Sequence, residues 1–273
     1  MAQSPEFVVG EVGSIWRYPI KSMRGEEIVT ANVTQRGLVG DRVLALVDVE
    51  TGKVASSKNP RRWPQLFGFR SAYEEATPEQ SAAIIWIVFP DGERVRSDSA
   101  DVESKLASQL GRPVRLASPG PGAATTEGYW PNYDWLSQRD EVFEFLFPTN
   151  TFYDGSIVHF LTTATLHHLH SFSPGSQFEP ARFRPNFVIN TADGLKGFVE
   201  NQWFGRTLKL GEVQLRVDRP CPRCVMTTLP QGALPKDPEV LRTAVQQNGG
   251  NVGVYASVIR GGQVRRGDTV ELL

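Results

Sequence analysis

Short runs of apolar residues among small and polar ones dominate the first hundred positions of the chain. In residues 7–18, Val9, Val12 and Ile15 lie among glycine, glutamate and serine residues. Runs of this length, bounded by Gly and Pro, predict β-strands, and a spacing of about ten residues is typical of a barrel or sandwich. We expect strands at 7–18, 27–33, 42–49, 67–73, 84–89 and 94–97, with a hairpin turn at 90–93.

The remaining strands are predicted in the second half of the chain. They are expected at 158–161, 183–189, 207–210 and 213–217, followed by a closing hairpin of 252–259 and 269–272 around Gly261-Gly262. Residues 118–122 form a cluster of Pro, Gly and Ser, which favours a domain boundary there. We therefore predict two domains, residues 1–120 and 121–273. Residues 128–135 are interpreted as an aromatic loop without a clear period.

Three short helices complete the prediction. One covers residues 100–110 and ends at Gly111, and one follows a Thr162 or Thr163 cap. The third begins at Asp237-Pro238, a cap followed by proline, and ends at Gly249-Gly250. The expected fold class is mainly β (α+β), with an N-terminal β-barrel-like domain packed on a second β-barrel.

Composition narrows the function classes. The chain has 273 residues, of which 40% are hydrophobic, and a net charge of −1. Such a balanced charge offers no basic field for nucleic acid. No apolar run approaches the roughly 20 residues of a membrane span, and the first seven residues lack the pattern of a secretory signal. With only two cysteines, a disulfide framework is excluded, and we expect a cytoplasmic protein.

The two cysteines stand as Cys221-Pro222-Arg223-Cys224, and three interpretations compete. They could be structural thiols, a redox pair or part of a metal site. A redox pair would normally open a helix, and zinc would need four ligands. Of the four histidines, His167 and His170 share a helix face, which is more simply a polar surface. A thiolate with few other protein ligands suits a metal that brings its own donors.

Three further segments carry side chains that could hold an anion. Lys21-Ser22 follows a turn, Asp41-Arg42 opens the third predicted strand, and Arg184-Pro185-Asn186 precedes a strand. Arg recognises phosphate through paired hydrogen bonds, and Lys acts as a point charge. Each segment taken alone is more simply explained by a surface or salt-bridged side chain.

Taken together, the segments 18–22, 40–42, 182–186 and 221–228 resemble MOSC-domain proteins, in which such motifs occur in the same order. The ending at residues 266–272 is also similar. The resemblance is to two-part members with an N-terminal β-barrel domain, the group of the mitochondrial amidoxime-reducing component and its bacterial relatives. It spans nearly the whole chain.

The resemblance implies a molybdenum–pterin cofactor, with Cys224 as the metal ligand and catalytic residue. The sequence departs from the animal members of this family at two positions. Pro222 stands where they often have Ser, and Gly155 stands where a residue with a hydroxyl group is expected. The cofactor-binding residues carried over from the resemblance are Lys21, Ser22, Arg42, Asp154, Ser156, Arg184, Asn186 and Cys224.

The implied activity is the reduction of N-hydroxylated, or other N-oxide or S-oxide, small molecules by oxygen-atom abstraction. A separate electron-donor protein is implied, because no haem, flavin or iron–sulfur ligand set is present. The alternatives are a sulfur carrier acting through a cysteine persulfide and a non-catalytic cofactor carrier. Trp130, Tyr133 and Trp135 could roof the cofactor cleft or form a hydrophobic cluster beside it, and Cys221 has no assigned role.

Overall fold

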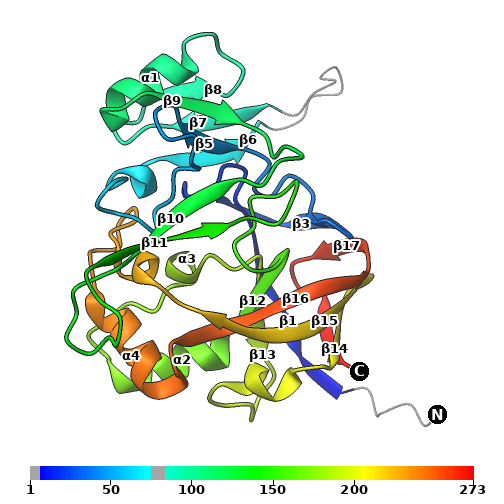
Figure 1. The fold of residues 1–273 in the computed structure, drawn as a ribbon. Coiled ribbons are helices and arrows are strands. Elements are labelled where there is room, and N and C mark those ends of the chain that lie inside the picture. Colours follow the sequence, from blue (N-terminus) through cyan, green and yellow to red (C-terminus); the bar gives the residue numbers. More distant parts are fainter. Residues whose placement is uncertain (1–6, 75–83) are drawn as a thin grey trace.

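The largest sheet of the fold closes into a ring of seven strands in the computed structural model, which describes residues 7–74 and 84–273 (Figure 1). An eighth strand, β2 (Glu26–Ile28), pairs with β1 outside the ring. In the order of pairing, the ring consists of β1 (Phe7–Arg17), β13 (Phe187–Thr191), β12 (Val158–Thr162), β16 (Asn251–Arg260), β15 (Val213–Pro222), β14 (Thr207–Leu210) and β18 (Thr269–Leu272).

Strand β1 joins the ring although its sequence lies far from the other six strands. It pairs antiparallel with β13 on one side and with β18 on the other. Val9, Val12 and Ile15 point into the core, where they pack with Phe160 and Leu215. Burying these apolar side chains stabilises the closed ring. The boundary at 120/121 stays a prediction.

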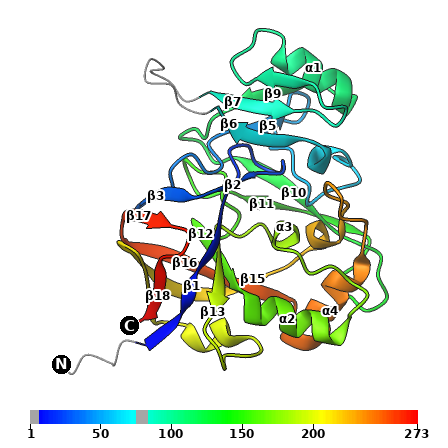
Figure 2. The ribbon, with the colours of Figure 1, turned by 180° about the vertical axis from the view of Figure 1, so that it is seen from behind.

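Small sheets build the rest of the fold. Those formed within residues 45–117 lie at the top of Figures 1 and 2 and have a separate core, whose buried residues include Phe69, Ile87 and Leu106. The small sheets are β5 (Ala45–Asp48) with β9 (Val114–Ala117); β6 (Arg70–Tyr73), β7 (Ile85–Val88) and β8 (Arg94–Arg96); β3 (Thr30–Thr34), β4 (Gly37–Leu38) and β17 (Gly262–Arg265); and β10 (Thr125–Trp130) with β11 (Glu141–Leu146).

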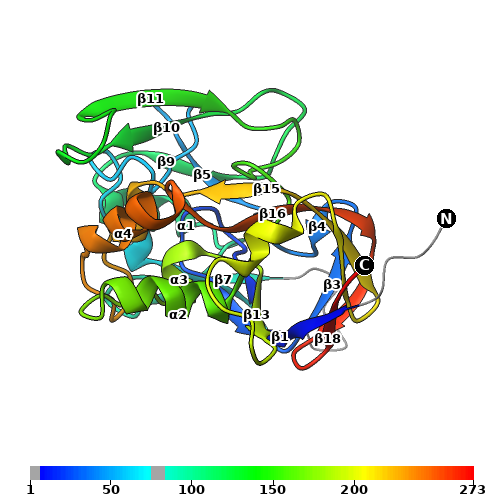
Figure 3. The ribbon, with the colours of Figure 1, turned by 90° about the horizontal axis from the view of Figure 1, so that it is seen from below.

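The three predicted helices are confirmed as α1 (Val102–Leu110), α2 (Thr163–Phe172) and α4 (Pro238–Asn248). The Thr162 hydroxyl caps α2 by accepting from the Thr165 amide, and Asp237 caps α4. Helices α2 and α4 pack on one side of the ring (Figures 2 and 3), through a core that includes Leu169 and Val240. Short 3₁₀ helices lie at Leu66–Gly68, Val199–Trp203 and Val225–Thr228.

Three local predictions are wrong. The segment 183–189 is not one strand, because Pro180–Phe183 forms helix α3, Arg184 is left-handed, and β13 begins only at Phe187. The closing hairpin is also wrong: β18 pairs with β1 and β14, and the intervening β17 pairs with β3. Residues 128–130 belong to strand β10 rather than to a loop.

Among the described residues, no helix combines the length and apolarity needed to cross a bilayer. The expectation about a secretory signal rests chiefly on residues 1–6, which lie outside the described part of the chain.

Candidate functional site

One cavity of about 210 Å³ is lined by every residue predicted to bind the cofactor. The residues come from separate parts of the chain, yet they line a single hollow between the ring and the N-terminal sheets. These residues are Lys21, Ser22, Arg42, Asp154, Ser156, Arg184, Asn186 and Cys224.

Unusual backbone conformation is concentrated at this cavity. Of the five non-glycine residues with positive φ in the described chain, three are Ser22 (65°), Arg42 (50°) and Arg184 (54°). The other two are Asp140 and Asn150, whose residue types tolerate this region. Strained conformations of this kind are typical of sites where side chains are held for function.

The buried Lys21 side chain, in the loop after β1, contacts the segment that precedes β12. It donates to the Phe152 carbonyl at 3.0 Å and to Asp154 Oδ1 at 2.6 Å. Lys58 pairs with the same carboxylate at 3.3 Å. Burial lowers the pKa of Lys21 to about 8, although Asp154 opposes the shift. Burial would raise the pKa of Asp154, but Lys21 and then Lys58 hold it below its ordinary value.

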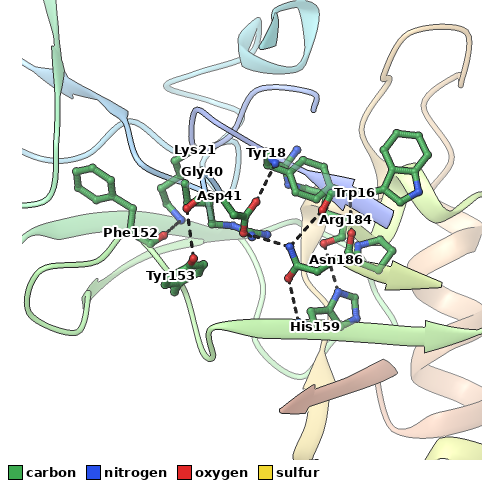
Figure 4. A network of polar contacts seen from close by, with 12 residues as sticks. Trp16, Tyr18, Lys21, Gly40, Asp41, Phe152, Tyr153, His159, Arg184 and Asn186 are labelled. Atoms are coloured by element: carbon green, nitrogen blue, oxygen red, sulfur yellow. Dashed lines mark hydrogen bonds and ion pairs between the residues drawn. The ribbon is translucent and has the colours of Figure 1, made fainter. Parts of the chain in front are cut away.

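A buried carboxylate, Asp41, connects the N-terminal half to the ring (Figure 4). Its Oδ1 accepts from the Tyr18 amide at 2.8 Å, and its Oδ2 accepts from Asn186 Nδ2 at 3.1 Å. Arg42 forms an ion pair with the same carboxylate. Burial opposes the charge on Arg42, but Asp41 keeps its pKa above the ordinary value. The network fixes Arg42 and Asn186 at the cavity wall.

Arg184 brings a positive charge to the cavity without an acidic partner among the described residues. Its guanidinium donates to the Met23 carbonyl at 2.6 Å and lies 4.1 Å from the centre of the Tyr18 ring. Burial lowers the pKa of Arg184 to about 10, so the side chain is still charged at neutral pH. A buried cation without a carboxylate is suited to receive an anion from outside the chain.

The two cysteines differ in accessibility, and neither forms a disulfide. Cys221 is buried at the end of β15, where burial raises the pKa of its thiol and Tyr255 is its hydrogen-bonding partner. Cys224 is half-buried and begins the 3₁₀ helix Val225–Thr228. Both line the cavity, and Cys224 is the more accessible of the two thiols.

Arg223, between the cysteines, is a structural anchor that sequence reasoning missed. Its guanidinium donates to the Val252 and Phe183 carbonyls and to His159 Nε2. Arg has no acceptor, so Nε2 must accept and the proton of neutral His159 lies on Nδ1, facing the Arg184 carbonyl at 3.3 Å. Burial, followed by Arg223, holds the pKa of His159 well below 6.5.

Further cavity residues had no signal of their own in the sequence. Lys58, His159 and Tyr255 line the cavity, but each is an isolated residue in the sequence. Asp41 and Arg223 could have been found, because Asp41 stands beside Arg42 and Arg223 stands between the two cysteines. Gly155 is explained by crowding: a Cβ there would lie 2.9 Å from the Tyr255 ring and 3.0 Å from Arg219.

Of the three aromatic residues proposed as a roof, only Trp130 lines the cavity. It stacks on Phe143 of the β10–β11 hairpin, with ring centres 5.3 Å apart. Tyr133 and Trp135 stack on each other instead, outside the cavity lining. Figure 3 shows this hairpin as an outer layer beyond β15.

The His167 and His170 pair is not part of the site. These residues line a separate depression beside α2. Within residues 7–74 and 84–273, no group of three or more His, Cys, Asp or Glu side chains could hold a metal ion.

The donor set fits an anionic cofactor that brings its own metal. Lys21, Arg42, Lys58 and Arg184 line the cavity, while the acidic lining residue, Asp154, is already neutralised by two lysines. A half-buried thiol completes the lining at Cys224. Cations of this kind bind phosphate, and a thiolate binds a soft metal.

Comparisons with known proteins agree with the two-part architecture. Residues 9–109 match the MOSC N-terminal beta barrel domain, and residues 148–271 match the MOSC domain. The mitochondrial amidoxime reducing component 2 of Rattus norvegicus is 25% identical over 296 residues, covering 96% of this chain and 83% of that protein. A molybdenum cofactor sulfurase of Anopheles gambiae is 37% identical over 79 residues, 28% of this chain and 10% of that protein.

Among solved structures, the YUAD protein of Bacillus subtilis superposes with a TM-score of 0.49 at 11% identity, covering 98% of this chain and 97% of that one. The two family matches together span both halves of the sequence. The chain is a MOSC-domain protein that carries an N-terminal MOSC β-barrel domain.

Proposed function

We propose that the chain binds a molybdenum–pterin cofactor through Cys224 and reduces N-hydroxylated small molecules. The observation that carries the proposal is that one cavity is lined by residues from separate parts of the chain: Lys21, Ser22, Arg42, Asp154, Gly155, Ser156, Arg184, Asn186 and Cys224. The amidoxime reducing components, which match across most of this chain, support the choice of substrate class.

The cations would hold the anionic end of the cofactor. Arg184 has no carboxylate partner among the described residues, and its charge is available to a phosphate. Lys21 and Arg42 are held in place by Asp154 and Asp41. Their acidic partners keep both side chains oriented before the cofactor arrives, which reduces the ordering cost of binding.

Cys224 would provide the thiolate ligand. It begins the segment Val225–Thr228, which is fixed because Arg182 donates to the Thr227 and Leu229 carbonyls. Arg182 is fully buried and donates also to Gln177 and Pro235 carbonyls. These bonds hold the backbone that positions the sulfur. Cys221 is buried and hydrogen-bonded to Tyr255, so its sulfur is less suited to bind the metal.

The bound cofactor would supply the redox chemistry, in which the N–O bond breaks, two electrons and two protons are consumed, and water leaves. The chain itself binds and orients the cofactor and shapes the entrance. Trp130 would limit the entrance on one side, favouring substrates with a flat apolar body. The electrons would come from a separate protein.

The test is anaerobic reduction of benzamidoxime by molybdenum-loaded protein, with reduced methyl viologen as the donor and benzamidine as the measured product. Turnover proportional to molybdenum content is expected. Fully loaded protein without turnover on N-hydroxylated or S-oxide compounds would contradict the reductase.

Sulfur transfer is the second candidate, because Cys224 is an accessible free thiol beside the buried Cys221. A desulfurase would then add one sulfur atom to Cys224 in molybdenum-free protein. Mass spectrometry of the intact chain distinguishes this outcome from metal binding.

A further inference from the structure

A second cavity, of about 520 Å³, shares Arg184 with the first. Trp16 and Tyr18 contribute aromatic lining, Pro180 comes from α3, and the loop 231–234 closes another side. In Figure 4, Trp16 and Arg184 lie at the opposite end of the network from Lys21 and Phe152. The proposed cofactor function does not use this cavity.

Two buried polar groups of this cavity lack hydrogen-bond partners. In the described residues only three side-chain atoms are both buried and unpartnered, and two of them are Arg24 Nε and Gln231 Nε2. Gln231 is only 5% exposed, and its backbone is fixed by reciprocal bonds with Leu234. A buried donor without an acceptor is costly, so both donors are suited to a ligand that supplies acceptors.

The same cavity carries uncompensated positive charge. Arg24 and Arg70 are brought together by a backbone bridge, and neither forms an ion pair within the described part of the chain. Burial, followed by the nearby Arg70, lowers the pKa of Arg24. The acidic lining residues are exposed, and Glu27 is already paired with Arg266 while Glu179 lies at the start of α3.

A glycine leaves room for the Arg24 side chain at the cavity. Gly232 has φ +58°, and a Cβ at this position would lie 2.9 Å from Arg24 NH1. Its absence lets the guanidinium reach the loop 231–234, where Gln231 also lies. Two orphaned donors from distant parts of the sequence thus line one hollow that also has apolar and aromatic walls.

We propose that this cavity is a second ligand site, for a small planar organic carboxylate. The carboxylate would accept from Arg24 and from Gln231, with Arg70 adding charge. The planar body would lie against Trp16 and the apolar lining. This proposal stands apart from the molybdenum site, because Arg24, Gln231 and Arg70 are not assigned to hold that cofactor, and Arg184, which lines both cavities, is not a donor to the carboxylate.

Isothermal titration of the metal-free full-length chain with benzoate tests the site. Acetate lacks the ring and benzamide lacks the charge, so both should bind at least about tenfold more weakly than benzoate. Arg24→Gln should weaken benzoate binding by about tenfold or more. Arg115→Gln, at an exposed arginine outside both cavities, is the matched control and should leave the affinity unchanged.

Gln231→Met provides a variant that keeps the fold. It removes the orphaned donor at similar size, so the melting temperature should stay the same or rise while benzoate binding weakens. Absence of saturable benzoate binding up to about 10 mM, or equal binding by wild type and both variants, would overturn the proposal. Molybdenum content of Arg24→Gln, expected to be normal, separates this result from the cofactor proposal.

Discussion

Arg223, the residue immediately before the proposed metal ligand Cys224, donates a hydrogen bond to the Nε2 atom of His159 at 2.5 Å. This bond links β12, which carries His159, to the loop after β15. It requires a neutral imidazole, and burial together with Arg223 holds the pKa of His159 well below 6.5. The arrangement makes the stability of the cavity wall dependent on pH.

The sign of this dependence follows from proton uptake. Below about pH 6.5 the unfolded chain binds a proton at His159, whereas the folded chain does not. The free energy of unfolding should therefore fall as the pH drops below about 6.5, with a slope approaching about 1.4 kcal/mol per pH unit. Urea denaturation between pH 7.5 and 5.5 measures it. His159→Gln, which keeps an acceptor for Arg223, should have a shallower slope, and an identical slope would exclude His159 as the cause.

The lowered pKa of Lys21 predicts that cofactor binding weakens as the pH rises, whereas the effect of His159 on stability appears as the pH falls. Burial lowers the pKa of Lys21 to about 8, so the free side chain loses its charge as the pH rises through that value. Retention of an anionic cofactor should weaken between pH 7 and 9, in a wash experiment that measures remaining molybdenum. Lys21→Arg stays charged and should flatten the dependence. Equal losses from both proteins would contradict the role of Lys21.

Asp41 should matter for stability more than its short side chain suggests. Asp41→Asn removes the charge beside Arg42 and places an amide where Tyr18 and Asn186 donate. Breaking one partner of a buried pair costs about 3 kcal/mol of unfolding free energy. Chemical denaturation measures the loss. Asp98→Asn breaks the exposed pair with Arg96 and serves as the control, with no measurable change expected. An equally small effect at Asp41 would show that the network does not join the two halves.

Trp130 should affect substrate binding rather than the metal. Trp130→Ala removes a cavity-lining ring while Cys224 and the cations remain, so KM for benzamidoxime should rise by about tenfold with normal molybdenum content. Tyr133→Ala is the matched control, because Tyr133 stacks on Trp135 outside the lining. Unchanged kinetics with a lower melting temperature in Trp130→Ala would instead assign the ring to the packing of the hairpin on Phe143.

The predictable part of the fold was local. Caps and terminal glycines located α1, α2 and α4, and the turn 90–93 located the β7–β8 hairpin. The β10–β11 hairpin was not predicted, because Gly128 interrupts the alternation of apolar and polar residues in β10. A Cβ at Gly128 would lie 2.4 Å from the Phe143 ring, so the glycine is explained only by a partner on the opposite strand.

The candidate site shows the same division. The residues carried over from the family motifs do line one cavity, whereas Lys58, His159 and Tyr255 belong to no motif that distinguishes them. Their positions depend on long-range pairing, such as that of β12 with β16, which places His159 opposite Tyr255. Likewise, the sequence alone could not show that β18 and β13 flank β1.

The most direct test of the central proposal is the molybdenum content of protein purified from a host that makes the cofactor. Wild type, Cys224→Ser and Cys221→Ser are compared by elemental analysis, with circular dichroism to confirm the fold. We expect about one molybdenum per chain in wild type, loss in Cys224→Ser, and retention in Cys221→Ser. A folded wild type without molybdenum, or equal retention in Cys224→Ser, would contradict the assignment of Cys224 as the metal ligand.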